Sequence, residues 1–541
     1  MELPRGALAP PLPFASLYEL SGGDSRATAP LALTEAALGE LLRCAFGLSA
    51  WKQHQSARWP LRVNPSSGNL HPTEAYVIAS GVVSHYAPDD HVLEQRARLD
   101  AQAWPAATRM GDGALVALSS IGWREAWKYG ERAFRYCQHD IGHAIGALRY
   151  AAALLGWRVQ LLPEWSDSDV SALVGIDRDE DFAGAEREWP ACIALVTAAF
   201  DVTAEDVPRG DLLAAARSAT WSGRANRLSA SHVAWPAIDA AAAATRYGGS
   251  GSRVTPPRTD TVGAAPSSMT TPAAAHEGTV AAGADVSDRA RAARDVILGR
   301  RSAVAFDPRG TLPRAAFARM LARLRPAPTL RVPTLREPTL RGGVLGAPVL
   351  SSPVPWDVFE RDDIGPQVHL VLFVHRVDGL APGIYAFLRD DAATDQWRSA
   401  LRPEFLWEPA GKTDLPGLYL LVPSDVTWAG TRLCCDQDIA GDGFFSLGMV
   451  ARFEPALREH GEWCYRRLFW ECGLIGQVLY LEAEAHGVRG TGIGCFYDDA
   501  VHDTLGLSGH DWQSLYHFSM GVPVDDPRLS TYPGYDWESA G

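Results

Sequence analysis

The sequence predicts an α+β fold made of two related halves, each a mainly antiparallel sheet with helices packed on it. Three observations support this. Strand-like and helix-like segments are mixed along the chain, one stretch of the first half recurs in the second, and a segment almost without large apolar residues separates the two. Such a mixture is typical of α+β proteins. The length, 541 residues, also exceeds what one core accommodates.

The individual elements follow from the hydrophobic pattern. In the first half we expect a helix over 33–46, "LTEAALGELLRCAF", and strands over 74–80 and 191–200. In the second half we expect a helix over 313–324 and strands over 368–377 and 417–423. The pattern alone does not fix the strand order.

An internal repeat relates the halves. The stretch "FRYCQHDIGHAIGALRYAAALLGW" begins at Phe134, and "YRRLFWECGLIGQVLYLEAEAHGV" begins at Tyr465, 331 positions later. The same offset pairs Gly142 with Gly473, and it pairs 170–176 with 501–507. Both copies predict a long helix that is apolar on nearly all faces, which indicates burial in a core or at an interface.

The domain boundaries come from composition. Residues 247–287 are rich in Gly, Ser, Thr, Pro and Ala and cannot bury a core, so we expect a flexible linker there. The first domain then spans 1–246 and the second 288–541.

Composition excludes several classes of function. The formal net charge of −14 argues against a general nucleic-acid or anionic-membrane binder. No apolar run is long enough to span a bilayer, and the N-terminal stretch lacks the pattern of a signal peptide. The eight cysteines contain no CxxC pair, which predicts neither a zinc ribbon nor a disulfide framework and fits a cytoplasmic protein.

Two short segments contain candidate ligand-binding groups. Arg300, Arg301 and Ser302 follow a predicted short helix in "RRSAVAFD". Arginine presents a planar fork that matches phosphate oxygens, although a basic helix end exposed to solvent is the simpler alternative. The second segment is "NPSSGN", which by itself is consistent with an ordinary turn. Its candidate residues are Pro65, Ser66, Ser67 and Asn69.

These segments resemble the nitroreductase-like flavoprotein family. "RRSAVAFD" resembles its opening Arg-x-Ser signature, "PSSGN" its second flavin-contacting motif, and "GTGIGCFYDDAVHDTLGL" from Gly490 its third. The resemblance implies that flavin mononucleotide (FMN) lies between two subunits, with the Pro-Ser-Ser segment coming from the opposite subunit. The third motif would contribute Gly492, Ile493 and Gly494.

The distribution of the motifs predicts an intramolecular pseudo-dimer with one flavin per chain. The first half contains "PSSGN" but has "RVQLLPEW" where the second half has "GTGIGCF". The second half contains the Arg-x-Ser segment but no Pro-Ser-Ser-x-Asn. Each half therefore has what the other lacks, and the preorganised polar loop would face the flavin ring from across the interface.

Most of the first half is similar to the SagB-type, or thiazoline/oxazoline oxidase, branch. In that branch a Lys-Tyr pair is assigned to catalysis, and here it corresponds to Lys128-Tyr129. The resemblance implies dehydrogenation of an azoline ring in a modified peptide. A partly desolvated Lys128 could act as the base, and Tyr129 could relay the proton or fix the substrate. A surface lysine beside an anchoring aromatic residue is the alternative.

One position departs from the family pattern. Many relatives have a basic residue two places after the serine, where this chain has Val304. Another cation must then help to hold the phosphate, and we expect Arg301 or Arg528 to do so.

Two further groups are weaker candidates. His139, Asp140 and His143 place two histidines one helical turn apart, but we expect no metal because a full ligand set is lacking. Adjacent Cys434 and Cys435 could be redox-active, although buried free cysteines are commoner.

The resulting hypothesis is an FMN-dependent dehydrogenase or oxidase acting on a small molecule or modified peptide, with a possible cyclodehydratase partner. The alternatives are an NAD(P)H-dependent nitro or quinone reductase on the same scaffold, and a flavin-free scaffold subunit of a biosynthetic complex. The pseudo-dimer could be monomeric or could form a homodimer.

Overall fold

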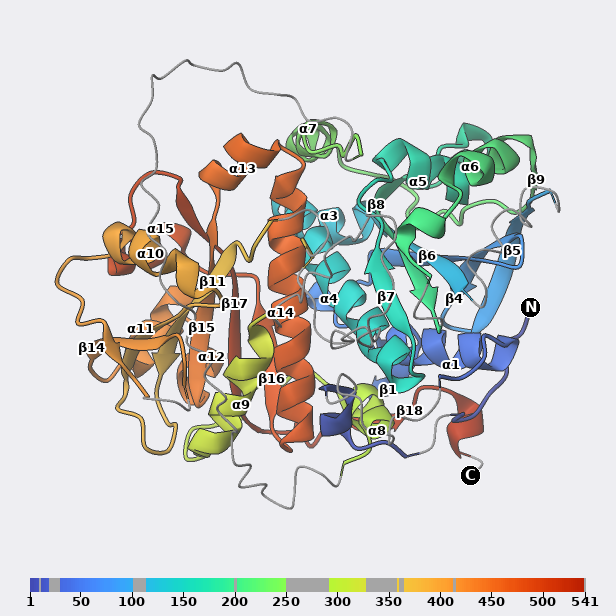
Figure 1. Ribbon diagram of the computed structural model, residues 1–541. Coiled ribbons are helices and arrows are strands. Elements are labelled where there is room, and N and C mark those ends of the chain that lie inside the picture. Colours follow the sequence, from blue (N-terminus) through green and yellow to red (C-terminus); the bar gives the residue numbers. More distant parts are fainter. Residues whose placement is uncertain are drawn as a thin grey trace, which may run out of the picture.

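Two sheet-containing halves lie side by side with two long helices packed between them (Figure 1). The computed structural model describes residues 1–8, 11–18, 30–100, 113–198, 202–249, 291–326, 358–359, 364–411 and 415–539. The expected linker, 247–287, lies outside the described residues except for its first three positions.

The first half forms a seven-stranded sheet in which every pairing is antiparallel. The strands in spatial order are β7 (Arg158–Leu161), β8 (Glu188–Thr197), β6 (Gly113–Ile121), β3 (Thr73–Ala79), β4 (Val82–Ala87), β5 (Val92–Arg98) and β9 (Thr220–Trp221).

The second half forms an equally antiparallel sheet. Its order is β10 (Phe306–Asp307), β17 (Trp512–Pro523), β15 (Phe445–Arg452), β11 (Val368–Val374), β12 (Gly383–Phe387), β14 (Leu418–Pro423) and β13 (Glu408–Pro409), with β16 (Arg489–Ile493) also paired to β17.

The helices pack on these sheets. Those of the first half are α1 (Glu35–Ala45), α3 (Trp123–Tyr129), α4 (Ala133–Leu154), α5 (Asp167–Val174), α6 (Arg209–Ser218) and α7 (Pro236–Ala244). Those of the second half are α8 (Ala293–Gly299), α9 (Arg314–Leu324), α10 (Thr394–Ala400), α11 (Thr427–Leu433), α12 (Asp438–Asp442), α13 (Glu454–His460), α14 (Cys464–Ala485) and α15 (Asp498–Leu505).

The sequence repeat is also a structural repeat. Helices α3 and α13, α4 and α14, and α5 and α15 begin and end 331 positions apart. Where α4 and α14 cross, a Cβ added to Gly142 would lie 2.1 Å from the Trp470 carbonyl oxygen. A Cβ added to Gly473 would lie 2.2 Å from the carbonyl oxygen of His139, which is the counterpart of Trp470. The contacts are reciprocal, as at a two-fold axis between identical subunits.

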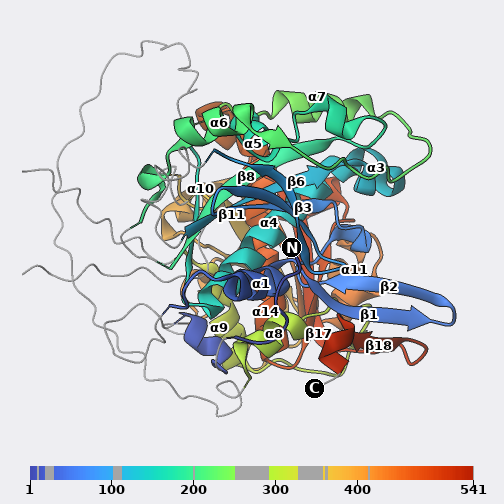
Figure 2. The same cartoon turned by 90° about the vertical axis from the view of Figure 1, so that its right-hand side faces the viewer.

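The two halves also exchange their ends. The Phe14 amide donates to the Arg291 carbonyl over 3.0 Å. Strand β18 (Ser530–Pro533) pairs with β1 (Leu48–His54), which in turn pairs with β2 (Ala57–Arg62). This three-stranded sheet projects from the molecule in Figure 2. The buried apolar core is continuous through both halves.

The fold class predicted from the sequence is therefore confirmed as two antiparallel, helix-covered halves that form an intramolecular pseudo-dimer. The exchanged ends mean that the second half contributes a strand to a sheet of the first. In the described part of the chain, no helix combines the length and the hydropathy needed to cross a bilayer.

Candidate functional site

A cavity of about 530 Å³ lies between the halves. Its volume is in the range of small-molecule sites. The structure brings together at its wall all but two of the residues expected from the sequence, namely Pro65, Ser66, Ser67, Asn69, Tyr129, Arg300, Arg301, Ser302, Gly492, Ile493 and Gly494. Neither half supplies this wall alone, because residues 65–69 and 129 belong to the first half and the others to the second.

The Pro-Ser-Ser loop is held rigid by its own side chains. Ser66 Oγ accepts a hydrogen bond from the His71 amide over 2.8 Å, and Asn69 Nδ2 donates to the Pro60 carbonyl over 2.9 Å. The Ser67 amide donates to Asp140 Oδ1 on α4 over 3.1 Å. These side chains line the cavity, but several of their polar atoms fasten the loop, so much of their contribution is preorganisation.

The Arg-x-Ser segment crosses from the second half to this loop. Arg300 is 4% exposed, and its Nε donates to the Val63 carbonyl over 2.9 Å. Its Nη1 is buried without a partner among the described residues. Burial lowers the pKa of Arg300 from its ordinary value. Ser302 Oγ donates to Tyr480 Oη over 3.0 Å, and the same oxygen accepts from the Gly492 amide over 2.8 Å. Tyr480 therefore couples the Arg-x-Ser segment to the glycine strand.

One end of the cavity is cationic. Arg301, Lys52 and Arg489 line it beside Arg300. Burial and then the charge of Arg300 lower the pKa of Arg301 to about 10. Burial and then the charge of Arg489 lower the pKa of Lys52. Sequence reasoning missed both Lys52 and Arg489, although Arg489 directly precedes "GTGIG" and could have been suspected on that ground.

Arg528 is not part of this end. Its side chain is 74% exposed and pairs with Asp526 over 2.7 Å, and it does not line the cavity. The expectation that Arg528 compensates for Val304 was wrong, because the local aspartate holds the guanidinium outside. Lys52 and Arg489 line the cavity instead, and Arg489 pairs with Asp525, another lining residue, over 2.7 Å.

The glycine strand lets its backbone closely approach two tyrosines, Tyr516 and Tyr136, that also line the cavity. A Cβ on Gly492 would lie 1.8 Å from Tyr516 Oη, and one on Gly494 would lie 2.6 Å from the Tyr136 ring. Tyr136 Oη donates to the Gly494 carbonyl over 3.1 Å. Larger residues here would displace this wall.

The Lys-Tyr pair lies at the cavity mouth, at the end of α3. Tyr129 lines the cavity, and its ring meets that of Tyr136 edge-on at 4.9 Å between centroids. A Cβ on Gly68 would lie 2.3 Å from Tyr129 Oη and 2.9 Å from Lys128 Nζ. We expected a partly desolvated Lys128, but its side chain is exposed. The helix end turns Tyr129 inward and leaves its neighbour facing solvent.

Two buried carboxyl groups beneath the loop were not anticipated as site residues. Glu125 is fully buried with both oxygens unpartnered among the described residues. Asp140 is 1% exposed and bonds to Ser67. Burial raises the pKa of both, and for Glu125 the charge of Asp140 adds to this. The sequence suggested Asp140 and His143 only as weak candidates for metal binding, whereas both line the cavity.

No metal site is apparent in the described ranges, where no three His, Cys, Asp or Glu residues gather in a ligating arrangement. His139 instead stacks on Tyr516 with 4.2 Å between ring centroids.

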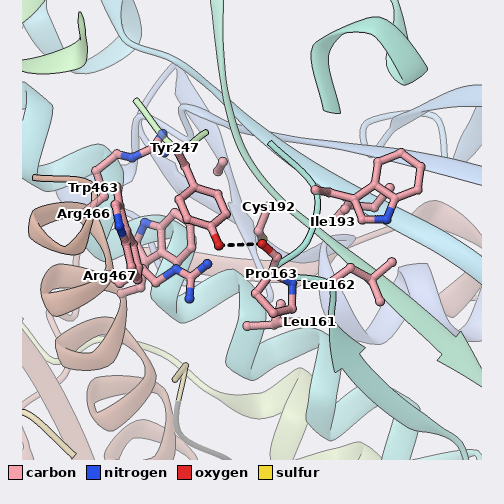
Figure 3. A pocket seen from close by; sticks show the side chains of 12 residues that line it. Leu161, Leu162, Pro163, Cys192, Ile193, Tyr247, Trp463, Arg466 and Arg467 are labelled. Carbon is pink, nitrogen blue, oxygen red and sulfur yellow. Dashed lines mark hydrogen bonds between the residues drawn. The ribbon is translucent and has the colours of Figure 1, made fainter. Parts of the chain in front are cut away.

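The symmetry-related position in the other half is closed. The repeat offset places Leu161, Leu162 and Pro163 where the open site has Gly492, Ile493 and Gly494. Only about 20 Å³ remains there, lined also by Trp463 and Arg467 (Figure 3). Tyr247 fills the space, and its Oη donates to the Pro163 carbonyl over 2.5 Å. Twenty cubic ångströms is room for about one water molecule.

Comparisons with known proteins agree with this architecture. The Nitroreductase family model matches residues 26–185 and 393–522. A crystal structure of an Anabaena variabilis protein assigned as a nitroreductase is 17% identical, with 97% of this chain and 94% of that chain covered and a TM-score of 0.59. At that identity the likeness concerns the fold.

Two other solved structures are more distant. The Escherichia coli microcin synthetase McbBCD complex with truncated pro-MccB17 is 20% identical over 34% of this chain and 71% of that chain, with a TM-score of 0.26. The FMN- and NADPH-dependent nitroreductase NfnB of a Sphingopyxis strain is 17% identical over 43% and 89%, with a TM-score of 0.21. No curated protein matches the chain.

Proposed function

The chain belongs to the nitroreductase family, and from this premise we propose that it is an FMN-dependent oxidoreductase with one flavin per chain. Members of this family are flavin-dependent oxidoreductases. The observation that carries the proposal is the cavity of about 530 Å³, whose wall joins the Pro-Ser-Ser loop of one half to the Arg-x-Ser segment of the other.

The donor set fits the two chemically different ends of FMN. Arg300, Arg301 and Lys52 suit a phosphate dianion, because charge-assisted hydrogen bonds are the strong ones. Arg300 and Asn64 line the cavity, and Arg300 Nη1 and Asn64 Oδ1 are buried without a partner among the described residues. Buried polar atoms need partners, and a polar ligand would supply them.

The remaining residues suit a planar ring. The loop around Ser66 and Ser67 would contact it from one half, and the backbone of Gly492, Ile493 and Gly494 from the other. The glycines let main-chain groups approach closely, and Tyr516 and Tyr136 pack against this segment. When bound, the flavin supplies the hydride chemistry, and the protein supplies orientation and electrostatics.

Lys128 and Tyr129 would handle protons at the mouth. Tyr129 Oη is held against the loop beside Gly68, and Lys128 Nζ lies 5.1 Å from the Tyr129 ring centroid. An exposed amine at a cavity mouth can exchange protons with solvent, and only in its unprotonated form can it take one from a substrate carbon. Asp140 holds Ser67 and so positions the loop from below.

For the substrate we favour an azoline-containing modified peptide or a related natural-product intermediate, as in the SagB-type branch that the first half resembles. The open position of Lys128, next to Trp127 with 58% of its side chain exposed, suits a bulky substrate that enters only in part. A cyclodehydratase that makes such rings would then be the partner.

The decisive measurement is a visible spectrum of the purified protein. We expect a flavin band near ~450 nm, the cofactor's own absorption. Arg300→Ala and a variant with loop 62–72 replaced should each lose it, while Arg309→Ala serves as a control because Arg309 is exposed and pairs with Asp307. A colourless wild-type protein would favour the flavin-free scaffold. Flavin retained in both variants would contradict a site that is shared between the two halves.

A second measurement separates the enzymatic alternatives. The flavin protein is mixed anaerobically with NADPH or with a synthetic thiazoline peptide. Bleaching by the peptide supports the dehydrogenase. Bleaching by NADPH alone supports the nitro or quinone reductase instead.

A further inference from the structure

A hydrogen bond between His143 and Tyr516 crosses from one half to the other at the wall of the cavity. His143 lies on α4 of the first half, Tyr516 lies on β17 of the second, and both line the cavity. His143 Nε2 and Tyr516 Oη are 3.2 Å apart, and both residues are buried. The function proposed above assigns neither of them a contact with the flavin.

The space for this histidine exists on one side of the helix crossing. A Cβ on Gly476 of α14 would lie 2.6 Å from His143 Cε1, so a larger residue there would displace the imidazole. The repeat offset of 331 makes Leu474 the counterpart of His143 and Ile145 the counterpart of Gly476. An apolar pair therefore occupies the symmetry-related positions. Because packing of the two helices is satisfied there without a histidine, His143 is best explained by the open cavity.

The backbone of β17 positions Tyr516. The register of the β15–β17 pairing shifts between Met449 and Val450, which leaves Leu515 as an extra residue in β17. Such a bulge re-aims neighbouring side chains and is frequent beside active sites. Tyr516 Oη comes so close to the glycine strand that a Cβ on Gly492 would lie 1.8 Å from it. The hydroxyl therefore lies at the segment that we expect to hold the flavin ring.

Both groups are neutral at ordinary pH. Burial, and then the charge of Arg300, lowers the pKa of His143 to about 3, and burial raises the pKa of Tyr516. A neutral imidazole has one N–H, and a buried N–H needs a partner. His143 Nδ1 has no partner among the described residues, whereas Tyr516 Oη lies within reach of Nε2. The proton therefore belongs on Nε2, and the hydroxyl proton of Tyr516 is left to donate elsewhere.

We propose that Tyr516 donates a hydrogen bond to the flavin ring, and that His143 is the positioning residue that orients its hydroxyl. This rests on the function proposed above. A donor beside the ring stabilises the negative charge that reduction places there. The contact therefore raises the reduction potential of the bound cofactor. A higher potential suits a dehydrogenase, because its cofactor must take electrons from the substrate.

The midpoint potential of the bound flavin tests the Tyr516 contact without any substrate. Each protein is titrated anaerobically against a redox dye of known potential. Tyr516→Phe removes only the hydroxyl and should lower the potential by about 30 mV or more, which is tenfold in a two-electron equilibrium. Tyr385→Phe is the matched control, because Tyr385 is buried, donates to the Ala381 carbonyl over 2.7 Å and does not line the cavity. A wild-type potential in Tyr516→Phe would overturn the proposal, and so would an equal fall in Tyr385→Phe.

The same titration tests the positioning role of His143. His143→Leu should lower the potential in the same direction, because the Tyr516 hydroxyl is then no longer oriented. His143→Gln should stay close to wild type, since its amide N–H can replace Nε2–H as the donor to Tyr516. A wild-type potential in His143→Leu, or an equal fall in both variants, would overturn this role. A colourless wild type would instead overturn the flavin assignment, whereas a yellow Tyr516→Phe of unchanged potential would overturn the contact and leave that assignment standing.

Discussion

Gly68 shows how a single residue determines the arrangement of the proposed catalytic pair. Its φ is +58°, and it is the point where the Pro-Ser-Ser loop touches Tyr129 and Lys128. Any side chain there would enter the space of the Tyr129 hydroxyl. Gly184 has a φ of +80° but nothing within 4 Å of an added Cβ. Comparing substitutions at the two glycines therefore distinguishes the effect of backbone strain from the effect of displacing Tyr129 and Lys128.

We expect Gly68→Ala and Gly184→Ala to lose similar stability, about 1–2 kcal/mol each for the left-handed backbone. Only Gly68→Ala should also lose turnover, by about tenfold or more, because small misplacements at a reacting centre are costly. Urea unfolding and turnover with whichever substrate bleaches the flavin measure the two effects. Equal turnover in both variants would mean that Tyr129 and Lys128 take no part.

The Glu125–Asp140 pair should make stability depend on pH. Burial raises the pKa of both carboxyls in the folded chain. The folded state then binds more protons than the unfolded state above the ordinary carboxyl pKa, so stability is present at low pH and is lost as pH rises. We expect the Tm of wild type to fall between ~pH 5 and ~pH 9 more steeply than that of Glu125→Gln, which has no carboxyl to ionise there.

If Tm falls with pH equally steeply in wild type and in Glu125→Gln, the buried carboxyl pair is not the cause of the pH dependence. The same conclusion follows if the wild-type curve is the flatter of the two, since that sign would require a carboxyl whose pKa is depressed by folding.

At the residue scale, the sequence predicted which segments come together at the cavity more successfully than it predicted the roles of individual side chains. The resemblance to family motifs was sufficient to predict that Arg300, Ser302 and residues 492–494 lie together, and all of them line the cavity. Lys52 could not be found, because it reaches the cavity only through the pairing of β1 with β18. The expectation for Arg528 was wrong because Asp526, two residues away, binds its guanidinium.

At the element scale, the crossing of α4 and α14 packs the two halves of the molecule against each other. The repeat predicted both helices, and their burial follows from apolar residues on nearly all faces. The ends that cross between the halves were not predictable. Strand β18 is four residues long and all of its residues are exposed. Its hydrophobic pattern therefore does not indicate that it pairs with β1.

We expect Gly142→Ala to destabilise the protein by about 1–3 kcal/mol, as overpacking of a tight contact does. A new methyl group would lie 2.1 Å from the Trp470 carbonyl, a backbone atom that cannot rotate away. Gly210→Ala is the control, since that glycine of α6 has nothing within 4 Å. There we expect equal or higher stability, because alanine favours helix by about 1 kcal/mol. Urea unfolding compares the two, and a stabilising Gly142→Ala would contradict the close crossing.

At the scale of the whole molecule, fusion has let the two symmetry-related positions diverge. One kept glycines at 492 and 494 and a cavity of about 530 Å³. The other has Leu161 and Pro163 at the same offset, with Trp463 and Tyr247 filling what remains. In a homodimer one sequence must serve both positions, whereas a tandem chain can keep one open and pack the other for stability.

The stoichiometry of flavin tests this asymmetry. We expect about one FMN per chain, released by denaturation and quantified by absorbance against protein concentration. Because Arg300 reaches only the open cavity, Arg300→Ala should release close to none. Loss of a buried charged hydrogen-bond donor costs about 1.5–3 kcal/mol, or roughly ten- to a hundredfold in affinity. Two flavins per wild-type chain, with one remaining in Arg300→Ala, would show that the closed position also binds flavin. The two positions would then be more similar than the absence of glycines at 161 and 163 indicates.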